Sequence, residues 1–550
     1  MLRTNKDVLT LARSVFIMVI AVLAAVVAQT HGQGQVGAEL YNGIQLPSVW
    51  PPRNDSLTLS PPAPPPYLAR PPAVIPIDVG RQLFVDDFLI EQTTLRRTFH
   101  ATAYHPASPA LKPDKPWEQE GGPTAMVFSD GVWYDPEDRL FKMWYMGGYC
   151  HSTCYATSRD GIRWEKPALD TQPGTNVVHT STRDSGTVWL DLQEKDQQRR
   201  WKMFLYQRAG VFSIYLSGDG IHWGKEVART GPTGDRTTVF YNPFRKVWVY
   251  SLREYFAPPD GVGRCRRYWE HPDAVAGAKW KAGEPVLWVG ADSLDPRRAD
   301  LNVQPELYNL DVVAYESVLV GLFSIWRGQP KDRPKPNEVC VGFSRDGFHW
   351  HRPDRRAFIP VSEHQGDWNG GNVQSAGGCC LVVDDDLYFY VSGRAGVPGS
   401  TTSGVSSTGL AILRRDGFAS MDAGESEGIL TTRPVRFCGR HLFVNADTDA
   451  GELCVEVLDD RGKVISPFTR GNCAPMRADK TLQAVRWKGA SDLSALAGRA
   501  VKFRFRLKKG SLYAFWVSPE ASGASHGFVA AGGPGFTGPT DAVGAPVRQP

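Results

Sequence analysis

A pattern of short apolar strands repeats along the middle of the chain. In each repeat an apolar strand with a polar start is followed by a strand rich in aromatic residues and by a third strand that ends in an Asp-Gly turn. The aromatic strands are expected at residues 140–145, 201–206, 247–250, 320–326 and 387–391. The turns lie in Ser158-Arg-Asp-Gly-Ile-Arg-Trp164, Ser217-Gly-Asp-Gly-Ile-His-Trp223 and Ser344-Arg-Asp-Gly-Phe-His-Trp350. Because Asp-Gly between apolar runs favours a hairpin, each repeat is predicted to form a small antiparallel sheet.

The repeat has a period of roughly 60 to 70 residues and occurs five times. The count includes a worn copy at residues 414–418 and a segment that ends at Trp280 without the Asp-Gly pair. Four-stranded units at a fixed period are typical of a β-propeller, so we predict a five-bladed β-propeller over residues 77–425. The repeated box resembles the Asp box of sialidase-type propellers. We interpret it as a structural turn, because a residue present in most blades cannot mark one site.

The flanking segments differ from the repeats. Alternating strands joined by turns predict a C-terminal β-sandwich over residues 430–531, which makes the fold class all-β. Residues 29–76, dense in proline, are expected to form a disordered linker, and residues 532–550 a disordered tail. Residues 77–90 are expected to form a strand pair that completes the last blade or clasps the edge of the propeller.

The N-terminus has the pattern of an export signal. Positive charges precede an apolar run over residues 15–28 that ends in small residues, so residues 1–28 are predicted to be a signal peptide. A membrane-spanning helix needs about 20 apolar residues, which makes an uncleaved anchor the weaker alternative. We expect a secreted or periplasmic protein with no membrane association after cleavage.

The composition of the chain limits the kinds of binding partner that we expect for it. The chain is 42% hydrophobic and 22% charged, with a formal net charge of +4, a balance that gives no reason to expect nucleic acid or a membrane surface as partner. No Cys or His spacing matches a zinc site, so no cofactor is expected, a structural calcium ion in the propeller channel being the exception left open. The sequence does not indicate an oligomeric state.

Candidate chemistry lies where the innermost strand of each blade begins, because these positions ring one mouth of the channel. Each blade brings a carboxylate there, in the order Glu120, Asp184, Asp235, Glu306 and Asp367. Their polar neighbours, predicted to bind substrate, are Arg183, Arg236, Asn309, Asn369, Asn372 and Gln374. Like charges at one mouth push their pKa values apart, and glycoside hydrolysis needs one ionised and one protonated carboxyl group. Trp368 is a predicted sugar-stacking platform, with packing as the equal alternative.

The predicted architecture and the stretch Gly451-Glu-Leu-Cys-Val-Glu-Val-Leu-Asp459 resemble the invertase and levanase family of glycoside hydrolases. The blade openings are similar to those of the arabinanase and β-xylosidase family. The resemblance implies that Asp184, which follows Arg183, stabilises the transition state and that Glu306 donates a proton. Glu306 falls in blade four, whereas those families place the donor in blade three, where this chain has Asp235. The invertase signature Asn-Asp-Pro-Asn-Gly is absent, so Glu120 or Asp130 would have to replace its acid.

The sequence thus predicts a secreted glycoside hydrolase that cleaves a polysaccharide or oligosaccharide with paired carboxylates. The base or nucleophile stays open among Glu120, Asp235 and Asp367. One alternative is a non-catalytic carbohydrate-binding propeller. Another is a sialidase-like enzyme or lyase acting on acidic glycans, for which Tyr315-Glu316 and arginines at the mouth would be the signs.

Overall fold

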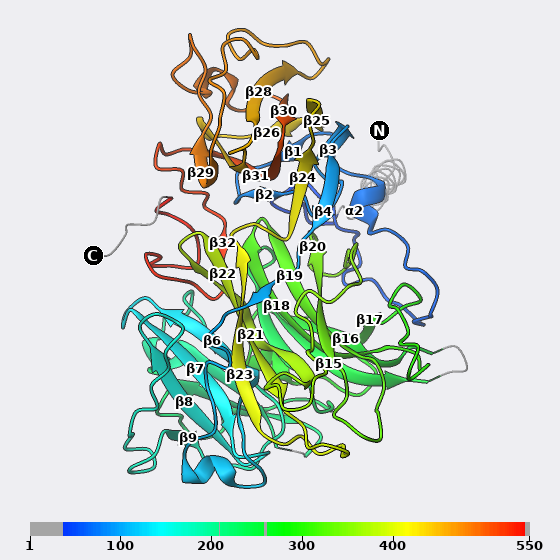
Figure 1. Ribbon diagram of the computed structural model, residues 1–550, viewed down its shortest axis with the longest axis vertical. Helices are drawn as coiled ribbons and strands as arrows, with labels where there is room; N and C mark the ends of the chain where they lie inside the picture. The colour runs from blue at the N-terminus through cyan, green and yellow to red at the C-terminus, as the bar shows by residue number, and fades with distance from the viewer. Residues whose placement is uncertain (1–36, 208, 258–260, 545–550) are drawn as a thin grey trace, which may run out of the picture.

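The computed structural model describes residues 37–207, 209–257 and 261–544 (Figure 1). The predicted signal peptide, residues 1–28, lies outside the described residues. The fold is all-β, with five four-stranded and two six-stranded sheets and a single-turn helix α2 (Pro66–Ala69). Within these ranges no helix has the length and apolar character needed to cross a membrane.

The first three strands of the five four-stranded sheets follow one another along the chain, whereas the fourth strands of the last two sheets come from its two ends. The first contains β6 (Ala125–Asp135), β7 (Leu140–Gly147), β8 (Ser152–Ser158) and β9 (Val177–His179). The second contains β10 (Gly186–Leu190), β11 (Trp201–Tyr206), β12 (Phe212–Ser217) and β13 (Ala228–Arg229). The third contains β14 (Thr238–Asn242), β15 (Val247–Phe256), β16 (Gly263–His271) and β17 (Val286–Gly290). The fourth contains β18 (Glu306–Glu316), β19 (Val318–Trp326), β20 (Glu338–Ser344) and β32 (Phe528–Val529). The fifth contains β21 (Gly371–Val383), β22 (Asp386–Arg394), β23 (Ser406–Arg414) and β5 (Ala103–Tyr104).

The first strands of these sheets, β6, β10, β14, β18 and β21, form a closed ring. Each contacts the next in chain order, and β21 contacts β6. We call this the strand ring; its upstream end is where the five strands begin, and its downstream end is where they finish. The second strands, β7, β11, β15, β19 and β22, are the aromatic strands expected from the sequence.

The Asp-Gly boxes form turns with the same hydrogen bonds in each copy. Asp160 Oδ1 accepts from the backbone two residues ahead at 2.8 Å, and Asp219 and Asp346 do the same at 2.8 and 2.9 Å. The turns also join neighbouring sheets, since Trp144 Nε1 donates to the Gly220 carbonyl oxygen at 2.7 Å. These contacts confirm the interpretation of the box as a structural turn.

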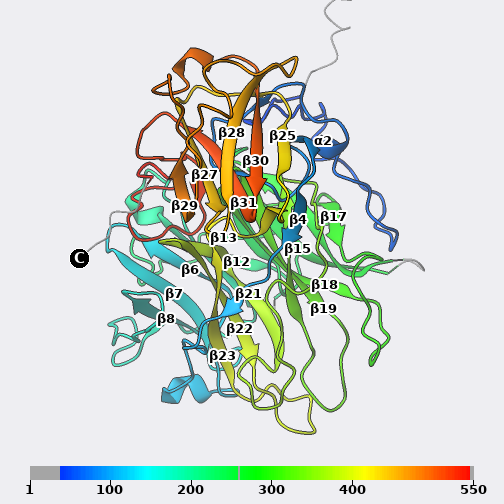
Figure 2. The same cartoon turned by 45° about the horizontal axis from the view of Figure 1, so that its top comes forward.

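The two six-stranded sheets pack on a common core at the other end of the molecule (Figure 2). One contains β1 (Ile75–Pro76), β26 (Val435–Arg436), β30 (Val501–Lys508), β25 (Gly428–Thr432), β3 (Ile90–Thr93) and β28 (Glu452–Asp459). The other contains β29 (Asp479–Ala484), β27 (His441–Asp447), β31 (Gly510–Ser518), β24 (Ala419–Ala423), β4 (Arg96–Phe99) and β2 (Gln82–Leu83). Phe505 of β30 and Phe515 of β31 lie 5.2 Å apart between the sheets.

The boundaries expected from the sequence are wrong at the N-terminal side. Residues 75–99 supply β1 to β4, which join the six-stranded sheets, so the segment 77–90 does not complete a four-stranded sheet. It does contact the four-stranded part, since Arg81 N donates to Glu316 at 3.0 Å and Arg345 donates to Asp86 at 2.8 Å. The strand that completes the fifth sheet is β5, through Ala411 paired with Tyr104. Residues 77–425 and 430–531 are therefore not two separate units, because both six-stranded sheets draw strands from before and after the ring.

The proline-rich segment is ordered over residues 37–76, which corrects the linker expected there; residues 29–36 of that prediction lie outside the described residues. Leu40, Ile44 and Tyr67 are buried in the core of the six-stranded sheets. Asn42 Nδ2 donates to the Arg345 carbonyl oxygen at 3.0 Å. Proline prevents a regular ladder, but an extended chain can still bury its apolar side chains against a surface.

The glycine-rich tail is also ordered as far as residue 544, which corrects the tail expected over residues 532–550. β32 pairs with β18, and Ala531 O accepts from Tyr134 N of β6 at 3.0 Å. Gly532 O accepts from Val382 N of β21 at 2.9 Å. The tail thus crosses the downstream end and ties three sheets together.

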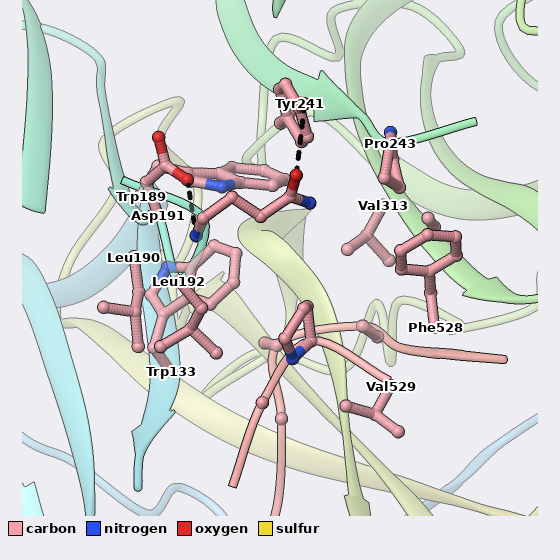
Figure 3. A pocket seen from close by; sticks show the side chains of 17 residues that line it. Trp133, Trp189, Leu190, Asp191, Leu192, Tyr241, Pro243, Val313, Phe528 and Val529 are labelled. Carbon is pink, nitrogen blue, oxygen red and sulfur yellow. Dashed lines mark hydrogen bonds between the residues drawn. The ribbon is translucent and has the colours of Figure 1, made fainter. Parts of the chain in front are cut away.

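A small cavity lies beneath this tail. Trp133, Trp189, Val313 and Val529 line it (Figure 3). Its volume is about 50 Å³, room for one or two water molecules.

Candidate active site

Two bulges fill the middle of the strand ring. Between Met126 and Gly131, four residues of β6 face a single residue of β7, and β21 has a bulge of the same size that includes Gly377. A Cβ at Gly377 would lie 3.0 Å from the Ser129 carbonyl oxygen. The bulges therefore pack against each other and form a floor beneath the upstream end.

The floor contains a buried ion pair between the first two sheets. Arg183 Nη1 lies 2.6 Å from Asp130 Oδ1, and both side chains are at most 1% exposed. Among the described residues nothing donates a hydrogen bond to Asp130 Oδ2. Burial raises the pKa of Asp130, and Arg183 opposes that rise. Asp130 is thus a carboxyl group with a raised pKa and one unpaired oxygen.

A second buried carboxyl group, Asp311 of β18, links the two bulges. Its Oδ2 accepts hydrogen bonds from Ser375 at 2.6 Å, Asn309 at 2.8 Å and Ser129 at 3.1 Å. Burial raises the pKa of Asp311, while the Ser375 hydrogen bond and the charge of Arg236 lower it. This network fixes the bulges to the fourth sheet.

Two arginines lie near the ring of Phe128. The Arg236 guanidinium carbon lies 3.5 Å from the centre of this ring, and that of Arg394 lies 5.9 Å away. Arg236 is 2% exposed and Arg394 is 8% exposed. Arg236 Nη2 donates to Ser129 Oγ at 3.2 Å, whereas its Nε and Nη1 have no hydrogen-bond partner in the described ranges.

Lys335 brings a third positive charge to the same place. Its Nζ donates to the Tyr308 hydroxyl oxygen at 2.8 Å and lies 4.4 Å from the centre of that ring. Burial alone would raise the pKa of Tyr308, but Lys335, Arg236 and Arg394 lower it, and the net shift is downward. We call Arg236, Arg394 and Lys335 the cation cluster.

Arg266 of β16 holds this cluster from behind. Its Nη1 donates to the Arg236 carbonyl oxygen at 2.6 Å, and its Nη2 donates to the Tyr308 carbonyl oxygen. Burial, followed by the charge of Arg236, lowers the pKa of Arg266 to about 9. Arg266 therefore positions two residues of the site and adds to its positive field.

The backbone is strained at the same end. Ser129, Arg236 and Asn372 adopt left-handed φ values of 63°, 59° and 51°. Such conformations are costly for residues other than glycine and concentrate at functional sites. The surrounding donors and acceptors fix which end of the Asn372 amide is the oxygen. In that orientation the oxygen accepts a hydrogen bond from Arg394 Nε at 2.9 Å.

Three of the sequence-predicted acids, Asp184, Asp235 and Glu306, lie beside this cluster, and we call them the rim carboxylates. Burial lowers the pKa of Arg236, and the charges of Asp184 and Asp235 are among those that oppose the lowering. Asp235 lies 3.4 Å from Arg253 Nη1 and is 41% exposed. Glu306 lies 2.5 Å from Arg264 Nη1, and the Arg264 guanidinium sits 5.6 Å from the Tyr308 ring.

The other predicted residues have different surroundings. Glu120 is exposed, and its carbonyl oxygen accepts from Tyr149 N at 2.7 Å. Asp367 is exposed and accepts from Ser362. Trp368 packs edge-on against Tyr104, with the ring centres 5.2 Å apart. This contact fits the alternative that Trp368 is a packing residue. Asn369 is buried near them, whereas Arg183, Asn309, Asn372 and Gln374 lie in or beside the floor.

Sequence analysis missed Phe128, Asp311 and Lys335. Asp311 carried a readable signal, because it stands two residues after Asn309 in an otherwise apolar strand and so faces the same side. Phe128 depends on the bulge in β6. Lys335 lies between strands, where no periodic pattern marks it.

The Tyr315-Glu316 pair lies at the downstream end. Glu316 is buried with Arg81, Arg415, Asp416 and Asp541, all with side chains at most 2% exposed. Its position corrects the sialidase-like interpretation of this pair, because buried ion pairs with other parts of the chain surround it.

A groove on the third sheet adjoins the rim. It has a volume of about 360 Å³ and is lined partly by Arg253, Tyr255, Arg267 and Lys281, a size within the usual range of ligand sites. In the part of the chain that the structure describes, no group of three or more His, Cys, Asp or Glu side chains is placed to hold a metal ion.

No protein-family model matches this chain, and no curated protein matches its sequence. Among solved structures, an N-acetylgalactosamine deacetylase from F. plautii in complex with blood group B trisaccharide has 13% identity and a TM-score of 0.36, over 62% of this chain and 97% of that one. A thermostable family-43 glycoside hydrolase has 12% identity and a TM-score of 0.39, over 55% and 95%. An exo-β-1,3-galactanase from Phanerochaete chrysosporium has 10% identity and a TM-score of 0.33, over 76% and 99%.

Proposed function

We propose that this protein is an exported glycoside hydrolase that acts on a polysaccharide or oligosaccharide at the upstream end of the strand ring. In this proposal the five four-stranded sheets are the blades of a five-bladed β-propeller. The two six-stranded sheets form a β-sandwich that, with the tail, covers the downstream end. Substrate then meets the ring at the end that carries the rim carboxylates.

The observation that carries this proposal is the placement of the rim carboxylates on three consecutive sheets around Arg236 and Tyr308. Hydrolysis of a glycosidic bond needs a carboxylic acid that protonates the leaving oxygen and a second carboxylate that acts as base or nucleophile. We assign proton donation to Glu306 and the base or nucleophile to Asp235. Asp184 stabilises the positive charge of the transition state.

The groove on the third sheet supports an extended substrate. It shares Arg253 with the ion pair of Asp235, so a glycan bound at the rim can continue into it. Tyr255, 56% exposed, offers an aromatic face to a sugar ring. We therefore expect activity on oligosaccharides to exceed activity on single glycosides.

The test is release of reducing sugar from a panel of glycans by the exported protein. Asp184→Asn and Glu306→Gln should each lower the rate at least about a hundredfold, the usual contribution of a carboxyl group that transfers protons or stabilises charge. Glu425→Gln is the matched control, since Glu425 is 84% exposed and pairs with Lys509 on the six-stranded part. Its rate should equal that of the parent protein.

Activity that survives both substitutions in folded protein would refute the assignment. Products with the ultraviolet absorbance of an unsaturated uronate would assign a lyase instead. Glycan binding without any cleavage would assign a non-catalytic propeller.

A further inference from the structure

We propose that the cation cluster binds an anionic group of the glycan, a carboxylate or a sulfate, so that the substrate is an acidic polysaccharide or oligosaccharide. The inference rests on the proposed function for the glycan nature of the ligand. The charge of the ligand follows from the site itself.

The first argument is that Arg236 and Arg394 are buried, Lys335 is partly buried, and none of the three has an ion-pair partner in the described part of the chain. No carboxylate of the described residues lies within ion-pair distance of Arg236, Arg394 or Lys335. Elsewhere the chain pairs its buried arginines, since Arg345 lies 2.8 Å from Asp86 and Arg352 lies 2.5 Å from Asp295. A buried charge without a partner is strongly unfavourable, so the missing anion at the upstream end is best supplied by the ligand.

The second argument is the set of hydrogen-bond donors that Arg236 leaves unused. Its Nε and Nη1 have no partner among the described residues, and Phe128 holds the guanidinium plane fixed at 3.5 Å. Guanidinium N–H groups without a partner are the donors from which a carboxylate or a sulfate accepts hydrogen bonds. Arg236 therefore keeps two donors that an anionic group of the ligand can use.

The third argument is the direction of the pKa shifts of Lys335 and Tyr308. Burial, followed by partly opposing charges, lowers the pKa of Lys335, and the cluster lowers the pKa of Tyr308. The lowered pKa of Tyr308 has the direction expected in a field with excess positive charge, whereas burial is the largest cause of the lowered pKa of Lys335. An anion bound there would offset this field and return both pKa values toward their ordinary range.

The experiment is affinity electrophoresis of the native protein through gels that contain polygalacturonate, carrageenan or neutral galactan. We expect retardation by polygalacturonate if the anion is a carboxylate, by carrageenan if it is a sulfate, and none by galactan. Arg394→Gln should weaken the retained binding at least about tenfold, as expected for a lost charged hydrogen bond. Arg356→Gln, at an arginine whose side chain is 77% exposed, is the matched control and should bind like the parent.

Equal retardation by galactan, or by neither acidic glycan, would overturn the inference. So would full binding by Arg394→Gln. If Arg394→Gln does not fold by circular dichroism, Lys335→Gln takes its place with the same expected direction. Asp184→Asn separates this inference from the proposed function, because it should lose cleavage and keep binding to the acidic glycan.

Discussion

The two ends of the strand ring both bury charged side chains, but they differ in what is left unpaired. Among the described residues, the buried arginines Arg81 and Arg415 of the downstream end lie next to carboxylates, whereas the upstream end pairs Arg183 with Asp130 and leaves Arg236 and Arg394 without an ion-pair partner. At the downstream end, Arg81 lies 2.8 Å from Asp416 and Arg415 lies 3.1 Å from Asp541, with Glu316 next to both arginines. At the upstream end, the cation cluster has no carboxylate within ion-pair distance among the described residues. Buried charges that satisfy one another hold parts of the chain together, whereas charges left without a partner indicate a ligand.

The largest expected effect is at the downstream end. Asp416 accepts from Arg81, Tyr315 and Asn445 at 2.8, 2.6 and 2.9 Å. Asp416→Asn leaves Arg81 with a weaker partner in a buried site, and the free energy of unfolding should fall by about 3 kcal/mol. Urea unfolding at neutral pH measures this change. If Asp416→Asn loses no more stability than an exposed control such as Glu425→Gln, the buried ion pairs around Asp416 do not stabilise the contact between the strand ring and the six-stranded sheets.

The opposite sign is expected at the upstream end. Burial lowers the pKa of Lys335 in the folded protein below its ordinary 10.5. The stability that Lys335 contributes is therefore present above pH 10.5 and is lost as pH falls through the lowered pKa of the folded state. Lys335→Met should therefore raise the free energy of unfolding at neutral pH by about 1 kcal/mol, although it weakens binding of acidic glycan. Destabilisation by Lys335→Met in urea unfolding would place Lys335 among the structural charges and remove the contrast between the two ends.

The smallest expected effect is on the pH dependence of stability. It arises because three carboxyl groups (Glu316, Asp416 and Asp541) share two arginines (Arg81 and Arg415) at the downstream end. Burial raises the pKa of Glu316 above its ordinary 4.5; Arg81 and Arg415 oppose the rise, and Asp416 adds to it. The stability that Glu316 contributes is full below 4.5 and is lost as pH rises through the raised value. Glu316→Gln should flatten the dependence of stability on pH in that window, with little change below it. A pH profile of melting temperature that matches the parent would contradict the raised pKa.

The repeat was predictable because its signals are local. Each Asp-Gly box closes hydrogen bonds within three residues, and each aromatic strand follows from its own composition. The interleaving of the six-stranded sheets was not predictable, since β4 pairs with a strand more than 300 residues away, as in Arg97 with Met421. Nothing near Arg97 encodes that partner.

The candidate site was predictable in part for the same reason. Asp184, Asp235 and Arg236 stand at strand starts, and a strand start fixes which end of the ring a residue reaches. Phe128 and Ser129 reach the ring through a bulge, and a bulge depends on what the neighbouring strand leaves open. The lack of a carboxylate within ion-pair distance of Arg236, among the described residues, is a property of the whole fold, so no single stretch of sequence could reveal it.

The most direct test is a crystal structure of Asp184→Asn with the acidic oligosaccharide that the electrophoresis selects. Our account predicts that the carboxylate or sulfate lies about 3 Å from Arg236 Nε or Nη1, with the glycosidic oxygen facing Glu306. An oligosaccharide bound elsewhere, or bound at the rim with its anionic group turned away from the cation cluster, would contradict it.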